Sequence, residues 1–273
     1  MAITASQVNA FRQKTGLPMM DCKKALEACD GDEEKAIEWL RAQGLGRVQK
    51  MADRVASEGR IACAVEGDCA GIVELRCETA PVSNTDDFIR LVNTIAKIAA
   101  RAANPTAENV LAEKLPDNPG RTLQDEMNEV FNRMREKMQI ARVSKVCGNV
   151  GQYVHHNGQV GVVVSLSAKA ADEVKTDLCM HIAAMRPTHM HRDLVEAAAV
   201  AKEKAVFAEE ASSKPAAAQE KIIAGKLGRW FSEFVLLEQP FVKDDKRSVA
   251  DWLKSHHPEL TVKNYVRYQV GGS

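Results

Sequence analysis

The feature that most constrains the fold is a pattern that occurs twice. In it, two segments of alternating apolar and polar residues are followed by one segment with helical spacing. From Arg60, the sequence RIACAVEGDCAGIVEL alternates apolar and polar residues on both sides of Gly67–Asp68, which predicts a β-hairpin. A segment with helical spacing follows at 86–101. The same order returns in GQYVHHNGQVGVVVSL, which turns at Asn157–Gly158, and in the helical ADEVKTDLCMHIAAM. This internal duplication predicts an α+β fold built from two similar subdomains.

Further strand candidates follow each of the two hairpin–helix units. One lies at 142–147 after the first unit, and two lie at 233–242 and 263–270 after the second. We therefore place a core N-subdomain at 59–147 and a core C-subdomain at 148–273.

Two helical insertions interrupt the repeated pattern. Residues 122–140 carry one apolar stripe, which is typical of a helix that faces a core. In 193–228, two helical segments are separated by Ser213-Lys214-Pro215, because proline is tolerated in a first helical turn but not within a helix. We expect an antiparallel helical hairpin at 190–228 that either associates with a partner or packs on its own domain. The stripe consists of Leu123, Met127, Phe131, Met134 and Met138.

Residues 1–46 predict a small bundle of three helices. Thr4 and Gln7 have the spacing of a capping box, and Asp32 is a suitable cap for the third helix. Three helices in so short a segment are typical of the ubiquitin-associated type. Residues 47–58 are polar and are interpreted as a linker.

The charge and hydropathy patterns exclude several classes of protein. Lys plus Arg and Asp plus Glu both number 37, so the chain offers no net positive field to hold nucleic acid phosphates. No apolar run approaches the ~20 residues that a membrane span needs. The N-terminus also lacks the basic start and apolar centre of a signal peptide. We expect a cytoplasmic protein with no membrane contact and no direct nucleic acid contact.

The seven cysteines and the seven histidines show no spacing typical of a metal or catalytic site. The sequence has no CxxC and no HExxH motif, and it has no glycine-rich phosphate loop. In a chain that is not exported, we interpret the cysteines as free thiols used as small apolar residues. We therefore expect no metal, no cofactor and no enzymatic activity.

The segment CETAPVSNTDDF connects the first hairpin to the helix at 86–101. Thr85 is a suitable helix cap, and two aspartates follow it in the positively polarised first turn. Phe88 continues the apolar face of the helix, so we interpret Asp87–Phe88 as a helix start and not as a binding tip. The chain turns earlier, through Ala80–Pro81, where the proline favours an extended conformation for the residue before it.

The N-terminal sequence TGLPMMDCKKALEACDGDEEKAIEWLR resembles the signature of the elongation factor Ts family. The resemblance continues in order through GIVELRCET, GVVVSL, DLCMHIAAMRP and LLEQPFVKDDKRSVADWL, and covers essentially the whole chain. It implies a ubiquitin-associated-like bundle, a duplicated α+β core and a helical hairpin inserted in the second subdomain. It also implies a translation elongation factor that binds elongation factor Tu–GDP, promotes GDP release and remains bound until GTP displaces it.

The resemblance implies which residues contact the partner. In the family, the N-terminal bundle grips the GTP-binding domain of elongation factor Tu, and the matching positions are Arg12, Met19 and Met20. Neighbours on a helix point ~100° apart, so a narrow inner stripe does not easily bury both methionines. The alternative is that both methionines pack among the three helices. His155 matches a family position that touches another domain of the partner, whereas His181 matches a helix in which core packing is expected.

The turn after the first hairpin departs from the family pattern. In typical members it reads Cys-Gln-Thr-Asp-Phe-Val, and its Asp-Phe tip enters the partner near the magnesium and phosphate site and loosens the bound GDP. Here Cys77, Thr79 and Val82 keep the register. Glu78 replaces the glutamine, and Ala80 and Pro81 stand in place of the tip. We expect this turn to approach the same region of the partner as a backbone wedge.

Two alternatives remain beside this hypothesis. The partner is expected in its GDP-bound and nucleotide-free forms, and either a homodimer of this chain or a 2:2 complex is compatible with the sequence. The competing function is a non-exchanging adaptor or dimerisation protein with a ubiquitin-associated-like binding module. Release of labelled GDP from elongation factor Tu distinguishes the two functions.

Overall fold

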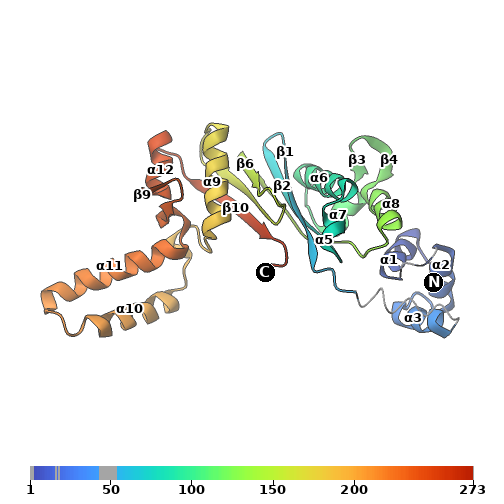
Figure 1. Ribbon diagram of the computed structural model, residues 1–273, viewed down its shortest axis with the longest axis horizontal. Helices are drawn as coiled ribbons and strands as arrows, with labels where there is room; N and C mark the ends of the chain where they lie inside the picture. The colour runs from blue at the N-terminus through green and yellow to red at the C-terminus, as the bar shows by residue number, and fades with distance from the viewer. Residues whose placement is uncertain (1–2, 16, 18, 43–53, 273) are drawn as a thin grey trace.

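The computed structural model describes residues 3–15, 17, 19–42 and 54–272. Three parts follow one another along the long axis of the molecule (Figure 1). A helical bundle lies at one end, a core with two sheets lies in the middle, and a pair of long helices projects at the other end. The mixture of helix and strand confirms the α+β class.

The N-terminal part is the predicted bundle of three helices. Thr4 N donates to Gln7 Oε1 and Gln7 N donates to Thr4 Oγ1, which confirms the capping box. Asp32 Oδ1 accepts from Lys35 N at the start of the third helix, as predicted. Most of the expected linker 47–58 lies outside the described residues. The helices are α1 (Ala5–Thr15), α2 (Met19–Ala28) and α3 (Glu33–Ala42).

Both predicted hairpins are present, and each belongs to a three-stranded antiparallel sheet. The first sheet has the order β1-β2-β5 and the second has the order β10-β7-β6, so the strand after each helix pairs with the second strand of its hairpin. This shared topology confirms the duplication. The strands are β1 (Glu58–Glu66), β2 (Cys69–Cys77), β5 (Gln139–Cys147), β6 (Asn149–Val154), β7 (Val160–Leu166) and β10 (Val262–Gln269).

The two sheets pack face to face, and one helix covers the outer face of each. Ile61 and Ile72 of the first sheet join Val163 and Tyr268 of the second in one buried cluster. Helix α6 (Asp86–Arg101) packs on the first sheet and α9 (Asp172–Met185) on the second (Figure 1). Gly71 permits the close approach of α6, because a Cβ there would collide with the backbone of Ala96.

The duplication extends further than the sequence pattern indicated. After α6, the chain forms the short strands β3 (Lys114–Leu115) and β4 (Asn118–Thr122), then α8 (Leu123–Met134). After the helical hairpin it forms β8 (Pro240–Phe241), β9 (Asp244–Ser248) and α12 (Val249–His256) in the same order. Equivalent backbone bonds, Leu123 N to Glu113 O and Val249 N to Gln239 O, close both motifs at 2.9 Å. The helix that we interpreted as an insertion is therefore part of the repeat.

Two of the predicted element boundaries were wrong. The helix expected at 122–140 ends at Met134, because Arg135 adopts a left-handed conformation with φ 57° that stops it. Met138 is buried, but it lies after the helix and just before β5. The strand expected at 233–242 is absent from the second sheet, because β10 occupies the place beside β7. Those residues form the end of α11, a 3-10 turn (Leu236–Glu238) and β8.

The helical hairpin consists of α10 (Ala197–Ala211) and α11 (Ala216–Phe234). Pro215 directly precedes the second helix, so the two helices are separated at 213–215 as the sequence predicted. The second helix continues to Phe234, beyond the expected end of the insertion at 228. The pair projects away from the sheets (Figure 1). Three smaller helical segments complete the part of the chain that the structure describes: α5 (Ala80–Ser83), α7 (Ala107–Ala112) and the 3-10 turn Arg192–Leu194.

The expectation of free thiols was wrong for two cysteines. Cys69 and Cys147 form a disulfide, because the antiparallel register of β2 and β5 places them directly opposite each other with Cα atoms 4.0 Å apart. The remaining described cysteines are free, and three of them are buried. Burial raises the pKa of the Cys77 thiol to about 12, which agrees with its use as an apolar residue.

Candidate partner-binding surface

The segment between β2 and α6 contains the short helical turn α5 (Ala80–Ser83), and we call its cap and first three residues, 79–82, the α5 turn. Thr79 caps it with an extended conformation, φ −128° and ψ 148°. Pro81 lies in the first helical turn, where a backbone N–H would have no partner within the helix, so its lack of an N–H costs no hydrogen bond. Ala80 is already helical, so the extended residue lies one position earlier than we expected.

Hydrogen bonds from distant residues hold the α5 turn in place. The carboxylate of Glu136 accepts from Thr79 N at 3.0 Å and from Thr79 Oγ1 at 2.7 Å. On the other side, Ser83 Oγ and Asn84 Nδ2 both donate to Ala80 O at 2.8 Å. The turn therefore has a defined backbone shape even though its side chains are small.

The exposed part of the α5 turn is narrower than the predicted set of four residues. Thr79, Ala80 and Pro81 are exposed, whereas Val82 is half-buried against the core of the first subdomain. Burial of Val82 anchors the turn to the core. The exposed tip therefore presents a backbone and a proline ring, with no large side chain.

The structure confirms that Asp87–Phe88 is a helix start. Thr85 Oγ1 accepts from Phe88 N at 3.3 Å and caps α6. Phe88 is fully buried with Leu91 on the apolar face of this helix. Asp87 pairs with Arg133 of α8 at 3.1 Å. Phe88 is therefore not available to a partner.

The paired methionines at the start of α2 both face the solvent. Met19 is 45% exposed and Met20 is 61% exposed, so the alternative in which both pack among the helices is wrong. Arg12 on α1 is half-buried, and its Nη2 donates to Asn132 Oδ1 of α8. The structure therefore uses Arg12 to connect the bundle to the core.

His155 lies at the turn between β6 and β7. Its Nδ1 lies 2.8 Å from the hydroxyl of Tyr153, and the ring is half-buried. His181 is fully buried between Gln239 Oε1 at 3.1 Å and Val242 N at 3.2 Å, which confirms its expected place in the core. Burial lowers the pKa of His181 to about 4.

Arg60 connects the two regions of the core that carry predicted contacts. Its side chain packs so closely on Gly158, in the turn after His155, that a Cβ there would collide with it. Its Nη1 donates at 2.9 Å to Asn84 Oδ1, and Asn84 in turn holds the α5 turn. Neither Arg60 nor Glu136 was singled out from the sequence, because each acts through a neighbour that is distant in the chain.

The structure contains two further observations that bear on function. Across the described parts of the chain, no three His, Cys, Asp or Glu side chains are grouped so that they could hold a metal ion. No described helix is both long enough and apolar enough to cross a membrane. These features define a multidomain α+β protein in which a ubiquitin-associated-like bundle with exposed methionines is joined to a duplicated core with a fixed exposed turn.

The comparisons with known proteins identify the particular family. The family model described as "Elongation factor TS" matches residues 78–272, and the model described as "UBA/TS-N domain" matches residues 18–40. Elongation factor Ts of Clostridium botulinum strain 657 (type Ba4) is 35% identical over 284 residues, which cover 98% of this chain and 92% of that protein. The protein of the same name from strain ATCC 19397 (type A) is 36% identical with the same coverage. The chain belongs to the elongation factor Ts family and is a translation elongation factor.

Proposed function

We propose that this chain binds elongation factor Tu–GDP, promotes the release of GDP and stays bound until GTP displaces it. The observation that supports the proposal is the exposed α5 turn, which Glu136 and Asn84 hold and which the resemblance matches to the tip of the family. The mechanism needs no chemical step. Binding more tightly to the nucleotide-free partner than to the GDP-bound partner weakens GDP binding by the same factor.

We propose that the α5 turn acts through its backbone. An Asp-Phe tip would bury a phenylalanine, which contributes roughly 1.5–3 kcal/mol at an interface. Here the tip is Ala80–Pro81, which offers much less apolar surface. A turn that is already fixed loses less conformational entropy on docking, and this offsets part of the lost contact. Hydrogen bonds hold the turn on both sides, through Thr79 and through Ala80 O. This supports a mechanism in which a rigid backbone presses on the partner over one in which a flexible side chain inserts.

The bundle and the second subdomain are proposed to supply the remaining contacts with the partner. Met19 and Met20 are exposed, and flexible thioether side chains adapt well to a partner's surface. His155 is proposed to touch a different domain of the partner, while Arg12 orients the bundle through Asn132. We also propose the protruding hairpin of α10 and α11 as a contact in a homodimer or in a 2:2 complex. The masses of the isolated chain and of its complex with elongation factor Tu, measured by light scattering, would distinguish these two assemblies.

Replacing Ala80–Pro81 by Gly–Gly is expected to slow the release of labelled GDP from elongation factor Tu, because the wedge loses stiffness. Replacing the same pair by Asp–Phe is expected to keep or raise the rate of release. The matched control is Asn104–Pro105 to Gly–Gly, which makes a comparable change in the loop before α7. A Gly–Gly variant at 80–81 that releases GDP as fast as the parent would contradict the wedge.

Deleting residues 1–46 is expected to leave a folded core that binds elongation factor Tu more weakly, as measured by calorimetry. The reason is that the exposed methionines are lost while the sheets and the core clusters of both subdomains are retained. The double replacement of Met19 and Met20 by serine is a gentler test, and Met185→Ser is its control because Met185 is exposed on α9. Unchanged affinity in both bundle variants would remove the bundle from the interface.

A further inference from the structure

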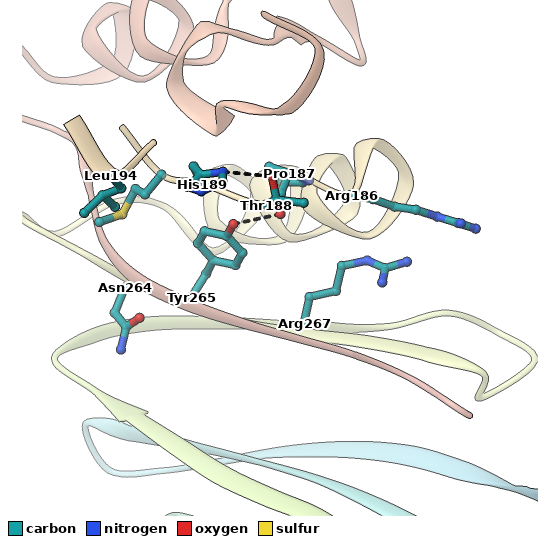
Figure 2. Close-up of a pocket in the computed structure, with 9 residues that line it drawn as sticks. Arg186, Pro187, Thr188, His189, Leu194, Asn264, Tyr265 and Arg267 are labelled. Carbon is teal, nitrogen blue, oxygen red and sulfur yellow. Dashed lines mark hydrogen bonds between the residues drawn. The ribbon is translucent and has the colours of Figure 1, made fainter. Parts of the chain in front are cut away.

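A pocket of about 560 Å³ lies in the second subdomain, away from the α5 turn. It is an open pocket lined by the end of α9, by the segment 186–194 and by β10, which is an edge strand of its sheet (Figure 2). None of the contacts proposed above uses this pocket. Its lining includes Arg186, Thr188, His189, Leu194, Tyr265 and Arg267.

One end of the pocket is basic. Arg267 Nε and Nη2 donate to Ala183 O, a carbonyl in the last turn of α9, at 3.3 and 3.2 Å. Arg186 is the left-handed residue that ends α9, with φ 51°. It is exposed, and within the described residues its side chain forms no hydrogen bond and no ion pair, while its backbone N donates to Ile182 O at 3.2 Å. The two side chains extend toward the same side of the pocket (Figure 2).

Within the described parts of the chain, these two guanidinium groups have no counter-charge. Among the residues that the structure describes, neither Arg186 nor Arg267 has a carboxylate partner, and the nearby Arg142 is already paired with Glu74. Burial, with Arg186 and Arg142 close by, holds the pKa of Arg267 below its usual range. A partly buried group of like charges is stabilised by an added anion, because solvent screens it poorly.

The other end of the pocket is apolar and has a fixed wall. The Tyr265 hydroxyl donates to Pro187 O at 2.9 Å, which holds the ring against the segment 186–194. Leu194 is 57% exposed beside it, at the opposite end from the arginines (Figure 2). A small inorganic anion would use only the basic end, whereas a peptide would use both ends.

We propose that this pocket binds an acidic peptide segment of a partner protein. A carboxylate would lie between Arg186 and Arg267, and an apolar side chain next to it in the peptide would pack on Leu194 and Tyr265. The guanidinium of Arg186 suits this role because its planar array of donors matches a carboxylate in two parallel hydrogen bonds. Arg267, whose Nε and Nη2 already donate to Ala183 O, adds its charge and its remaining donor. The inference goes beyond the exchange function and uses none of the residues proposed for it.

The test uses the full chain labelled for NMR, with acetyl-Leu-Glu-Asp-Leu-amide as the probe and acetyl-Leu-Gln-Asn-Leu-amide as its neutral match. We expect the acidic peptide to shift signals of Arg186, Thr188 and Tyr265 at millimolar concentration and the neutral peptide to shift them far less. Arg186→Gln is expected to weaken binding about tenfold, because a charge-assisted pair is lost from an exposed side chain with no structural partner. Lys263→Gln, an exposed change on the same strand outside the pocket lining, is the matched control and should leave binding unchanged.

Three outcomes would overturn the proposal. The first is equal binding of the neutral peptide, and the second is an Arg186→Gln variant that binds as tightly as the Lys263→Gln control. The third is inorganic phosphate that saturates the same signals at a lower concentration than the acidic peptide does, which would make a free oxyanion the occupant. Leu194→Ser distinguishes peptide binding from anion binding, because it should weaken the binding of the acidic peptide and leave the binding of phosphate unchanged.

Discussion

Replacing Phe88 by alanine is expected to lower the free energy of unfolding by about 3–5 kcal/mol, measured by urea denaturation. Phe88 is fully buried and packs with Leu91, Val92 and Ile95 against the first sheet, so its removal leaves a cavity under α6. The change should affect GDP release only as far as it unfolds the protein. Comparing stability with GDP release therefore shows whether Phe88 acts as a core residue or as an interface residue.

Phe88→Leu is the matched variant, because it keeps most of the apolar volume, and we expect it to lose clearly less stability than Phe88→Ala. Both variants are then assayed for GDP release at a temperature at which they remain folded. A Phe88→Ala variant that stays fully stable but loses exchange would show that Asp87–Phe88 is the working tip. That result would remove the α5 turn from the mechanism.

Replacing Glu74 by alanine is expected to destabilise the fold by a similar amount, about 3–5 kcal/mol, because it removes a buried carboxylate and leaves two half-buried arginines without their partner. The side chain of Glu74 is fully buried. Its Oε1 accepts from Arg76 Nε at 2.7 Å and from Gly271 N at 3.0 Å, and its Oε2 accepts from Arg142 Nε at 2.6 Å. The carboxylate therefore joins β2 of the first sheet to the end of the chain after β10.

Glu66→Ala provides the control for this second change. Glu66 pairs with Arg101 at 2.8 Å, but the pair lies at the surface, where such bridges contribute about 0–1 kcal/mol. Urea denaturation of the two variants compares a fully buried carboxylate with a half-buried one in the same sheet, whose arginine partner is exposed. The interpretation of Glu74 as the connection between the subdomains fails if Glu74→Ala unfolds no more easily than Glu66→Ala.

The local elements of this protein follow from the sequence, because they depend on residues close together in the chain. Alternation around Gly67–Asp68 and Asn157–Gly158 predicts both hairpins. The cap at Thr85 and the apolar face that begins at Phe88 predict α6. The order of these elements, occurring twice, then predicts the duplicated core. Where a local signal was missing, as at Arg135, which ends α8 without glycine or proline, the prediction failed.

The tertiary structure decided which distant residues meet, and most of the candidate site depends on this. Strand register placed Cys69 opposite Cys147 and turned two expected thiols into a disulfide. Folding brought Glu136 to Thr79, while the approach of the second sheet brought Gly158 to Arg60. The sequence identified where the α5 turn and the paired methionines lie. Only the packing of distant segments determined what holds the turn, because hydrogen bonds and burial act through space and leave no periodic signal along the chain.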